Sequence, residues 1–504
     1  MHFLDYSAVA LFFIAMIIIG FYSFNKIKSS EDFFVAGGKV PWWLSGISHH
    51  VSGYSGVVFV AYAAIAYKYG LTLYFWWGFN IAIAVILGSI FIVPRWPRLR
   101  QKLNIQSPTE YLKLRYNTSA QQIIAWSGVM VKLFDVAAKW ASMGILLHGF
   151  TGLPIWLGIV VSGGVSLLYI AVGGLWADLW TDFAQFVVQI VAGLVLFIST
   201  IMYLGGVSAL FDIWDKLPKA NSQMFNGPYT AAWTFGFFFV ILLSYTGGTW
   251  NLAARFISTP NSVQAKKSAY VSAVLYLVWP LILFFPMWAG PIIFPGLEDP
   301  AANLYPMLTK EFLPPGLVGL VLASMFANTM SMTTSDANTI SAVITRDILP
   351  NLYKQFRNLS QRASLKLARN STIVFTVLTM IIAVNKDAFG DVIGLILTWF
   401  GALLGPTAIP MILGLFPTFK HCDSRAAIIS ILGGLITFAV INYSGIVFPQ
   451  SIKTVLPLII AFVLYSGIGL INKSKNDKVS DEIEDLLDYL SKPEDISAGV
   501  GISN

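Results

Sequence analysis

Cysteine, histidine and charged residues are scarce in this sequence. Charged residues make up 11% of the 504 positions, histidine occurs five times, and Cys422 is the single cysteine. One cysteine excludes an intrachain disulfide and gives no basis for a cysteine-containing metal site. The sequence has no Walker motif or other nucleotide fingerprint, so we expect any energy source to be an ion gradient. No nucleic-acid-binding motif accompanies the net charge of +7, and we expect no nucleic-acid partner.

Apolar residues dominate the chain instead. They make up 56% of it, and the mean hydropathy is +0.70. This is more apolar surface than a globular interior can bury, so much of the chain must lie in a lipid bilayer. Runs of spanning length fall at about 4–24, 42–67, 71–94, 120–147, 154–172, 177–205, 231–256, 266–294, 315–345, 370–385, 389–417, 425–444 and 453–472. The sequence therefore predicts an all-α integral membrane protein of about 13 transmembrane helices.

The basic residues predict how the chain is oriented. The first run, 4–24, lacks the basic flank and cleavage site of a signal peptide, so we expect it to be retained. Lys and Arg crowd alternate loops, most densely at 95–115 and 346–369. Because basic loops stay in the cytoplasm, we predict an outside N-terminus and a cytoplasmic C-terminus, in the inner (plasma) membrane. The acidic segment 473–504 is then a cytosolic tail with a short helix, which is either solvated or has a regulatory or partner-binding role. We expect the protein to act as a monomer.

Two of the apolar runs are interrupted near their middle. Small and hydroxylated residues cluster at 52–56 in the run 42–67 and at 244–249 in the run 231–256. Small residues lower the cost of unwinding a helix, and the freed carbonyls can then line a cavity at half depth, as in a transporter. A Gly-rich helix packed closely on a neighbour would explain the first cluster equally well. Close packing would not require the matching break in the second run.

The two interrupted runs divide the chain into related halves. Each is followed by four further spans, and the second begins after an odd number of crossings from the first, so the halves run in opposite directions through the membrane. We therefore predict the following organisation: an extra helix and cytosolic loop at 1–41, a first repeat at 42–205, an extracellular loop at 206–229, a second repeat at 230–417, two C-terminal helices at 418–472, and the tail.

Ionisable residues inside the spans mark candidate sites, because they are costly in lipid. Lys132, Asp135 and Lys139 share one helical face. Two interpretations are open for them: a self-neutralising structural cluster, or contact with a substrate or gate. Asp178 lies where an aspartate can cap a helix. Asp182, about two turns into that helix, suits a cation ligand.

Hydroxyl and amide side chains crowd the run 323–345 beside Asp336. An isolated Ser or Thr in a span usually bonds back to its own helix. A row of them beside a carboxylate is better explained by a hard cation such as sodium, which prefers several oxygen ligands.

These motifs resemble the sodium/solute symporter family. The resemblance runs from DFFVAGGKVPWW (32–43) through GGLWADLWTDFAQ (173–185) and AARFIS (253–258) to TRDI (345–348). The pattern GG-x-x-A-x-x-W-T-D-x-x-Q at 173–185 is the specific part. The resemblance implies a LeuT-type five-plus-five inverted repeat, with one extra helix before it and two after. It also implies sodium-coupled transport of a small solute.

The resemblance further implies two sodium sites. The main site would use the carbonyl oxygens of Val51 and Tyr54 with side chains of Asn328 and Ser331. The second would use Asp182, Thr334 and Ser335, with Asp336 as an additional ion or proton site. Where the family has a second hydroxyl, this chain has Met332, and a thioether is a poor ligand for a hard cation. Three readings are open: a weak site, an oxygen borrowed from Thr329 or Thr333, or coupling to protons instead of sodium.

The implied solute site carries over less completely. Family positions that contact sugar fall on Val58, Trp77, Asn80, Tyr276 and Thr398, Tyr245 matches an aromatic inner gate, and Ser55 joins them from the break. Asp135 stands where the sialic acid member has a carboxylate-binding arginine. An acidic substrate would therefore need Lys132 or Lys139 instead. His49 and His50, just ahead of the break, would hydrogen-bond a hydroxylated solute, carry a coupled proton, or pack in the core.

We therefore expect sodium-driven uptake of a small polar organic solute. A sugar, polyol or sugar derivative fits best, because aromatic faces are combined with hydroxyl, amide and imidazole groups. The alternative is sodium- or proton-coupled symport of an amino acid or carboxylate, and outside transport it is a membrane solute sensor. A channel would need a continuous polar lining. An enzyme would need a nucleophile and base, or a metal set, near one interface, and we expect none.

Overall fold

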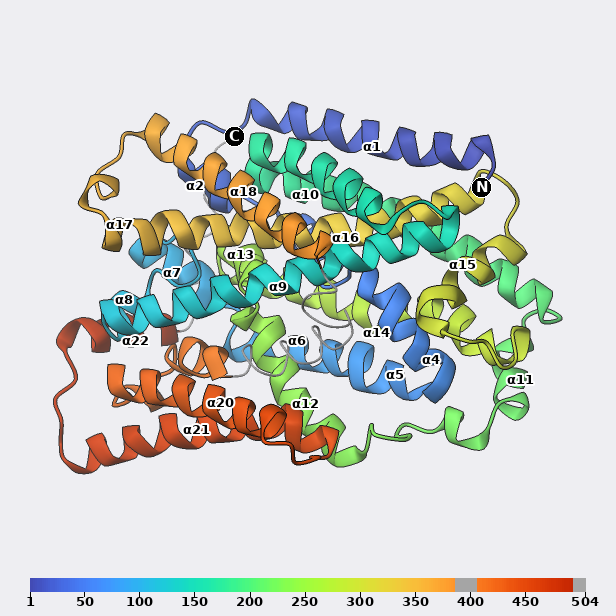
Figure 1. The fold of residues 1–504 in the computed structure, drawn as a ribbon. Coiled ribbons are helices and arrows are strands. Elements are labelled where there is room, and N and C mark those ends of the chain that lie inside the picture. The colour runs from blue at the N-terminus through green and yellow to red at the C-terminus, as the bar shows by residue number, and fades with distance from the viewer. Residues whose placement is uncertain (386–405, 493–504) are drawn as a thin grey trace.

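The computed structural model describes residues 1–385 and 406–492, which are mainly helical (Figure 1). The helices of the first half are α1 (Phe3–Phe24), α2 (Ser30–Val35), η1 (Ala36–Gly38), α3 (Trp42–Val51), η2 (Val58–Tyr62), α4 (Ala63–Tyr69), α5 (Thr72–Tyr74), η3 (Phe75–Phe79), α6 (Asn80–Phe91), α7 (Arg95–Leu103), α8 (Leu112–Arg115), α9 (Thr118–Thr151) and α10 (Ile155–Tyr203). Within α10, two helices meet at a kink at Gly174, where φ is 49° and ψ is −144°.

The helices that follow include the second interrupted run. They are α11 (Ala209–Lys216), η4 (Lys219–Ser222), α12 (Ala231–Leu243), η5 (Ser244–Gly248), α13 (Trp250–Ile257), α14 (Ser262–Ile293), α15 (Pro300–Phe312), α16 (Leu317–Ala342), η6 (Val343–Ile348), α17 (Leu349–Leu352), η7 (Lys354–Phe356), α18 (Gln361–Val384), η9 (Pro417–Phe419), α20 (Ser424–Tyr443), α21 (Gln450–Ser474) and α22 (Asp481–Ser491). The short apolar run 370–385 lies in α18, which has 24 residues and is long enough to span.

Nine helices in the described part of the chain are long and apolar enough to cross a membrane. The difference from about 13 lies in four places. The charged helix α9 and the interrupted run from α3 to α4 are not among the nine, and α10 counts once. Most of the run 389–417, with Thr398, lies outside the described residues. The exact number of spans stays a prediction.

Both predicted interruptions are present. Helix α3 ends at Val51, and helix resumes only at Gly56. Gly53 lies so close to α14 that a Cβ there would meet the Tyr276 hydroxyl oxygen at 1.8 Å. In the second run, Gly247 has φ of 139°, a conformation that favours glycine, and Thr249 is extended before α13 begins. The two breaks lie together, because the His49 Nε2 atom is 3.0 Å from the Tyr245 carbonyl oxygen.

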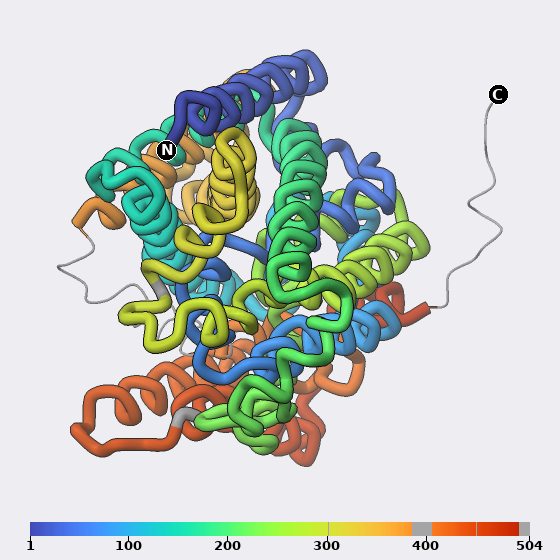
Figure 2. Tube along the Cα trace, turned by 90° about the vertical axis from the view of Figure 1, so that its right-hand side faces the viewer, coloured from blue at the N-terminus to red at the C-terminus, as the bar shows by residue number. Residues whose placement is uncertain are grey.

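The helices form two groups around these breaks. We call α3, α4, α6, α13 and α14 the bundle, and α9, α10, α16 and α18 the scaffold, because the members of each group pack on one another. Helix α1 lies at one edge of the molecule, and the paired helices α20 and α21 lie at the opposite edge (Figure 2). Helices α7, α8, α17 and α22 gather at one end of the long helices, and α11 and α15 at the other (Figure 1).

The acidic tail forms the predicted short helix, α22, but this helix is not free in solvent. Leu486, Leu487 and Leu490 are each only 1% exposed. Ion pairs of 2.7 Å join Lys102 to Asp485 and Lys420 to Glu484. The tail therefore docks on α7 and the loop around η9, and the reading of a solvated tail is wrong for this helix.

Candidate ion site and solute cavity

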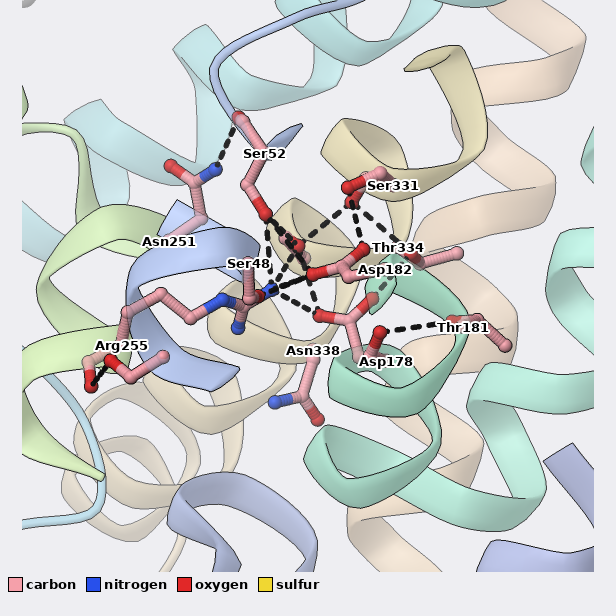
Figure 3. Close-up of polar contacts among 12 residues, drawn as sticks. Ser48, Ser52, Asp178, Thr181, Asp182, Asn251, Arg255, Ser331, Thr334 and Asn338 are labelled. Atoms are coloured by element: carbon pink, nitrogen blue, oxygen red, sulfur yellow. Dashed lines mark hydrogen bonds and ion pairs between the residues drawn. The ribbon is translucent and has the colours of Figure 1, made fainter. Parts of the chain in front are cut away.

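Two carboxylates lie one turn apart in α10, directly after the Gly174 kink. Asp178 and Asp182 are four residues apart, so they share a helical face, and both are fully buried. That face packs against α16, which presents Ser331, Thr334 and Ser335 to it. Asp178 bonds to side chains of other helices, so its role is more than a cap (Figure 3).

Asp182 receives hydrogen bonds from both groups of helices. Ser331 of the scaffold donates to its Oδ1 atom at 2.5 Å. Ser48 of α3 donates to its Oδ2 atom, and Ser52 lies 3.4 Å from the same oxygen. The predicted ion ligand Asp182 therefore faces the break after α3.

The other two residues predicted for the second sodium site lie on Asp178. Thr334 donates to its Oδ1 atom at 2.6 Å, and Ser335 donates to its Oδ2 atom at 2.9 Å. The structure thus joins the predicted residues into one cluster with two carboxylates instead of one. Ser331 belongs to the same cluster through Asp182.

Arg255 of α13 completes this cluster, although no sequence pattern predicted it. Its Nη2 atom lies 2.5 Å from Asp178 Oδ2 and 3.3 Å from Asp182 Oδ2, and it also bonds to Ser335 (Figure 3). The arginine is fully buried. A lone arginine inside an apolar run is costly unless it is paired with an acidic group. Its position in the run was therefore the sequence signal that could have identified Arg255 as a site residue. Two carboxylates and one guanidinium leave the cluster with a formal charge of −1.

Of the residues predicted for the main sodium site, Ser331 belongs to this cluster, whereas Val51, Tyr54 and Asn328 make local contacts. The Val51 carbonyl accepts the Tyr54 amide at 3.0 Å. Asn328 donates to the Ser324 carbonyl at 2.8 Å, and its Oδ1 atom has no hydrogen-bond partner in the described ranges. A carbonyl oxygen has two lone pairs, so both groups can still accept a cation.

Thr329 and Thr333, the two possible replacements for the hydroxyl missing at Met332, make different contacts. Thr329 accepts the Gly56 amide at 2.8 Å, which anchors the chain where helix resumes after the break. Thr333 bonds back to its own helix, to the Thr329 carbonyl at 2.8 Å. Met332 itself lines the cavity described below.

Asp336 belongs to a second charged cluster on the other side of α16. Lys132 lies 3.0 Å from Asp135 and 2.7 Å from Asp336, and Lys139 lies 2.7 Å and 2.8 Å from the same two carboxylates. The ring has two charges of each sign and is formally neutral, as the self-neutralising interpretation expects. Asp135 is its most open member, with 13% of its side chain exposed.

A cavity of about 350 Å³ lies between the break after α3, the charged residues Asp135 and Lys139 of α9, and α12. Five of the residues named for the solute site line it: Ser55, Val58, Trp77, Asp135 and Tyr245. Further lining residues are Lys139 and an aromatic set that the sequence did not predict, composed of Tyr62, Tyr69, Tyr229, Trp233 and Phe237. Trp76 lines it as well.

Other predicted solute residues are engaged in packing. His49 lies 2.7 Å from the Ser272 hydroxyl and bonds to the Tyr245 backbone. The Tyr276 hydroxyl donates to the His50 carbonyl at 2.9 Å, and Asn80 donates to the Thr234 carbonyl at 3.2 Å. Neither ring nitrogen of the fully buried His50 has a hydrogen-bond partner among the described residues. None of these four residues lines the 350 Å³ cavity.

A family model for the sodium:solute symporter family matches residues 33–434. The chain belongs to this family. A sodium/sialic acid symporter of Aliivibrio fischeri is 25% identical and covers 96% of both chains. A sodium/glucose cotransporter of Vibrio parahaemolyticus is also 25% identical, over 81% of this chain and 78% of that protein. The symporter is thus a sodium-coupled membrane transporter and not an enzyme.

A solved structure shows the fold of the symporter. It is a substrate-bound outward-open sodium-coupled sialic acid symporter, with a TM-score of 0.81 at 21% identity over 93% of this chain and 98% of the other. The all-helical fold is therefore of the predicted LeuT type.

Proposed function

We propose that the symporter takes up a small polar organic solute, most favourably a sugar, polyol or sugar derivative, on an inward sodium gradient. One observation carries this proposal: a single short segment touches both prospective sites. Gly53 and Ser55 line the cavity, whereas Ser52, directly before Gly53, bonds to Ser335 at 3.0 Å and contacts Asp182. A solute and an ion bound at these places would act on the same few residues of the break.

The cluster at Asp182 supports the ion half of the proposal. Its formal charge of −1 favours a monovalent cation, and its hydroxyl oxygens are ligands that sodium accepts. We assign sodium binding to Asp182 and Ser331 with Asn328 and the carbonyl of Val51 at the edge. Tyr54 supplies a second carbonyl, and Thr334 and Ser335 reach the same cluster through Asp178.

The cavity supports the solute half. Its volume of about 350 Å³ suits a small organic molecule. Aromatic faces from Trp76, Trp77 and Tyr245 suit the apolar face of a sugar ring, and Ser55 and Asp135 offer hydrogen bonds. Asp135 bonds both lysines of its ring through Oδ2, which leaves Oδ1 as an acceptor for a hydroxyl.

A carboxylate or amino acid is the second candidate class. The observation in its favour is Lys139, which lines the cavity beside Asp135. An acidic group on the solute could take the place of one carboxylate of the ring. Asp336 would then lose its ion pair with a lysine of the ring and would be available to bind a proton or a second ion.

Transport would proceed by alternating access. The bundle would rock against the scaffold and expose the cavity first to one side and then to the other. Sodium and solute each favour the same outward-open state in such a scheme, and coupling of this kind is about 1–3 kcal/mol. We further propose an outside N-terminus, a cytoplasmic C-terminus, an inner-membrane location and a functional monomer. The gathering of the basic helix α7 with α8, α17 and α22 at one end supports this orientation.

The test is uptake into proteoliposomes of purified symporter. A panel of sugars, sugar acids and amino acids is offered under separately imposed sodium and proton gradients. We expect a sugar or sugar derivative to accumulate only with the sodium gradient. Accumulation of every transported solute with the proton gradient alone would overturn the sodium assignment. If only the amino acids of the panel are transported, the proposed solute class is wrong.

A further inference from the structure

We propose that the Arg255 guanidinium is a tethered cation that competes with sodium for the Asp178–Asp182 pair and thereby sets the sodium affinity. This inference rests on the proposed sodium site at Asp182. Its basis is the position of a single nitrogen atom. Arg255 Nη2 is surrounded by four oxygens: Asp178 Oδ2 at 2.5 Å, Ser52 Oγ at 3.2 Å, Asp182 Oδ2 at 3.3 Å, and the Ser335 hydroxyl. Carboxylate and hydroxyl oxygens converging on one point are also what a hard cation requires.

The rest of the guanidinium is poorly held, which makes its displacement feasible. Its Nε and Nη1 atoms are buried and have no hydrogen-bond partner in the part of the chain that the structure describes. An arginine placed only to bridge carboxylates normally uses a two-nitrogen fork. Arg255 instead concentrates its contacts on one nitrogen. Loss of that one position would break every polar contact that its side chain makes here.

The charges define what competition would do. The two carboxylates exceed the one guanidinium, so the cluster can attract one more cation, but the guanidinium already neutralises half of it. The nearby ring of Lys132, Asp135, Lys139 and Asp336 is formally neutral and adds little to this balance. Removal of the arginine charge therefore strengthens the field at the pair. An arginine that merely supported the site would have the opposite effect when removed, because the ligands would lose their order.

The competition also links ion binding to movement. Arg255 and Ser52 belong to the bundle side of the two breaks, whereas Asp178, Asp182 and Ser335 belong to the scaffold. While Nη2 occupies the pair, it ties α13 to α10 and α16 through a buried ion pair. Sodium that takes its place would release α13 and keep the carboxylates neutralised. Ion entry would thereby exchange a bond between the two groups of helices for a bond to the ion.

The test measures sodium binding directly, without transport. Purified wild type, Arg255→Gln and Arg255→Lys are titrated with sodium against a potassium background, and the rise in Tm is recorded. We expect Arg255→Gln to lower the half-saturating sodium concentration about tenfold, within the range typical of coupled sites. Arg255→Lys keeps the charge and should stay close to wild type. Arg369→Gln is the matched control, because in the described residues that arginine bonds to the Val172 carbonyl and lies over the Phe24 ring, outside the cluster.

The outcomes separate this inference from the proposed function. If sodium stabilises wild type but Arg255→Gln binds it equally or more weakly, the competition is overturned and the sodium site stands. If sodium does not stabilise wild type at all, the sodium site itself fails. Should Arg255→Gln not fold, the double variant Asp178→Asn with Arg255→Gln restores the charge of −1. We then expect sodium binding within about threefold of wild type, and a loss of binding in the folded double variant would contradict the inference.

Discussion

At the residue scale, the hydroxyl groups around Asp182 act as both donors and ligands. The Ser331 hydroxyl donates a hydrogen bond to the carboxylate at 2.5 Å. A hydroxyl oxygen keeps two lone pairs while its hydrogen is engaged, so the same group can also face a cation. The carboxylate thus orients the hydroxyl for the ion, and each serine contributes through geometry as well as charge.

Removal of one such hydroxyl should weaken sodium binding selectively. We expect Ser331→Ala to raise the half-saturating sodium concentration for uptake about tenfold, since a hydrogen bond to a charged group contributes about 1.5 kcal/mol. The control is Ser324→Ala on the same helix, whose hydroxyl bonds back to the Val321 carbonyl. Asp182→Ala should abolish sodium-stimulated uptake. Unchanged sodium dependence in both Ser331→Ala and Asp182→Ala would contradict the ion assignment.

The close approach at Gly53 gives a second prediction for a single residue. A methyl group there would meet the Tyr276 hydroxyl oxygen at 1.8 Å, and the next atom of that ring, Cζ, at 3.1 Å. We expect Gly53→Ala to lose most solute uptake and to lower the Tm. Tyr276→Phe removes the clashing oxygen, so the double variant should recover part of both. A double variant no better than Gly53→Ala would show that the clash is not the cause.

At the scale of elements, the tail helix α22 combines two kinds of contact with the end of the molecule. Its leucines are buried, whereas the ion pairs of Glu484 and Asp485 are partly exposed to solvent. Arg98 also donates to the Leu490 carbonyl at 2.9 Å, which satisfies one of the last carbonyls of the helix. Exposed ion pairs contribute little to stability, so burial of the leucines should dominate the docking.

Two substitutions on α22 separate these contributions. We expect Leu487→Ala to weaken docking by about 2 kcal/mol, the low end for truncation of a buried leucine. Glu484→Gln is the matched control on the same helix and should change docking much less. Amide hydrogen exchange over 481–491 measures the docked fraction. Faster exchange in Glu484→Gln than in Leu487→Ala would mean that the ion pairs, and not the leucines, hold the helix.

The ion pair of Glu484 predicts how docking responds to acid. The hydrogen bond from Lys420 and its charge lower the pKa of this carboxyl below its ordinary value. The attraction is therefore fully present above the ordinary glutamate pKa and is lost as the pH falls through the lowered one. Because the intrinsic rate of amide exchange itself varies with pH, the readout is the protection over 481–491 relative to the unprotected rate at each pH. We expect this protection to be flat around neutral pH and to fall only in strong acid. In Glu484→Gln this contribution to the acid response should be absent.

Interrupted helices could be predicted from the sequence, whereas the pairing of Arg255 could not. Glycine and hydroxyl residues in mid-span are a local pattern, and both breaks occur where that pattern placed them. Arg255 meets Asp178 from 77 residues away, and no local periodicity contains that distance. The same limit applies to His49, whose partner Ser272 lies on α14. Sequence patterns thus specified where the chain bends, but not which side chains meet there.

At the scale of the whole molecule, coupling requires a path between ion and solute. The structure offers a short one, because Ser52 contacts the carboxylate cluster while its neighbour Gly53 lines the cavity. By thermodynamic linkage, sodium must raise the affinity for the solute by the same factor by which the solute raises the affinity for sodium. This factor therefore gives the strength of the coupling between the two sites, and it can be obtained from binding measurements alone.

Substitution of Ser52 should reduce that factor more than it reduces either affinity. Ser52→Ala removes the hydroxyl that bridges α3 to Ser335 and Asp182, but leaves the lining of the cavity and the two carboxylates intact. We expect the mutual enhancement, measured by titrating sodium with and without saturating transported solute, to fall severalfold toward one. The control is Ser45→Ala on the same helix, because in the part of the chain that the structure describes the Ser45 hydroxyl bonds within the bundle, to the Arg255 carbonyl and the Ser268 hydroxyl. If Ser52→Ala leaves the enhancement intact while Ser45→Ala reduces it, coupling runs through the bundle interior and not through the break.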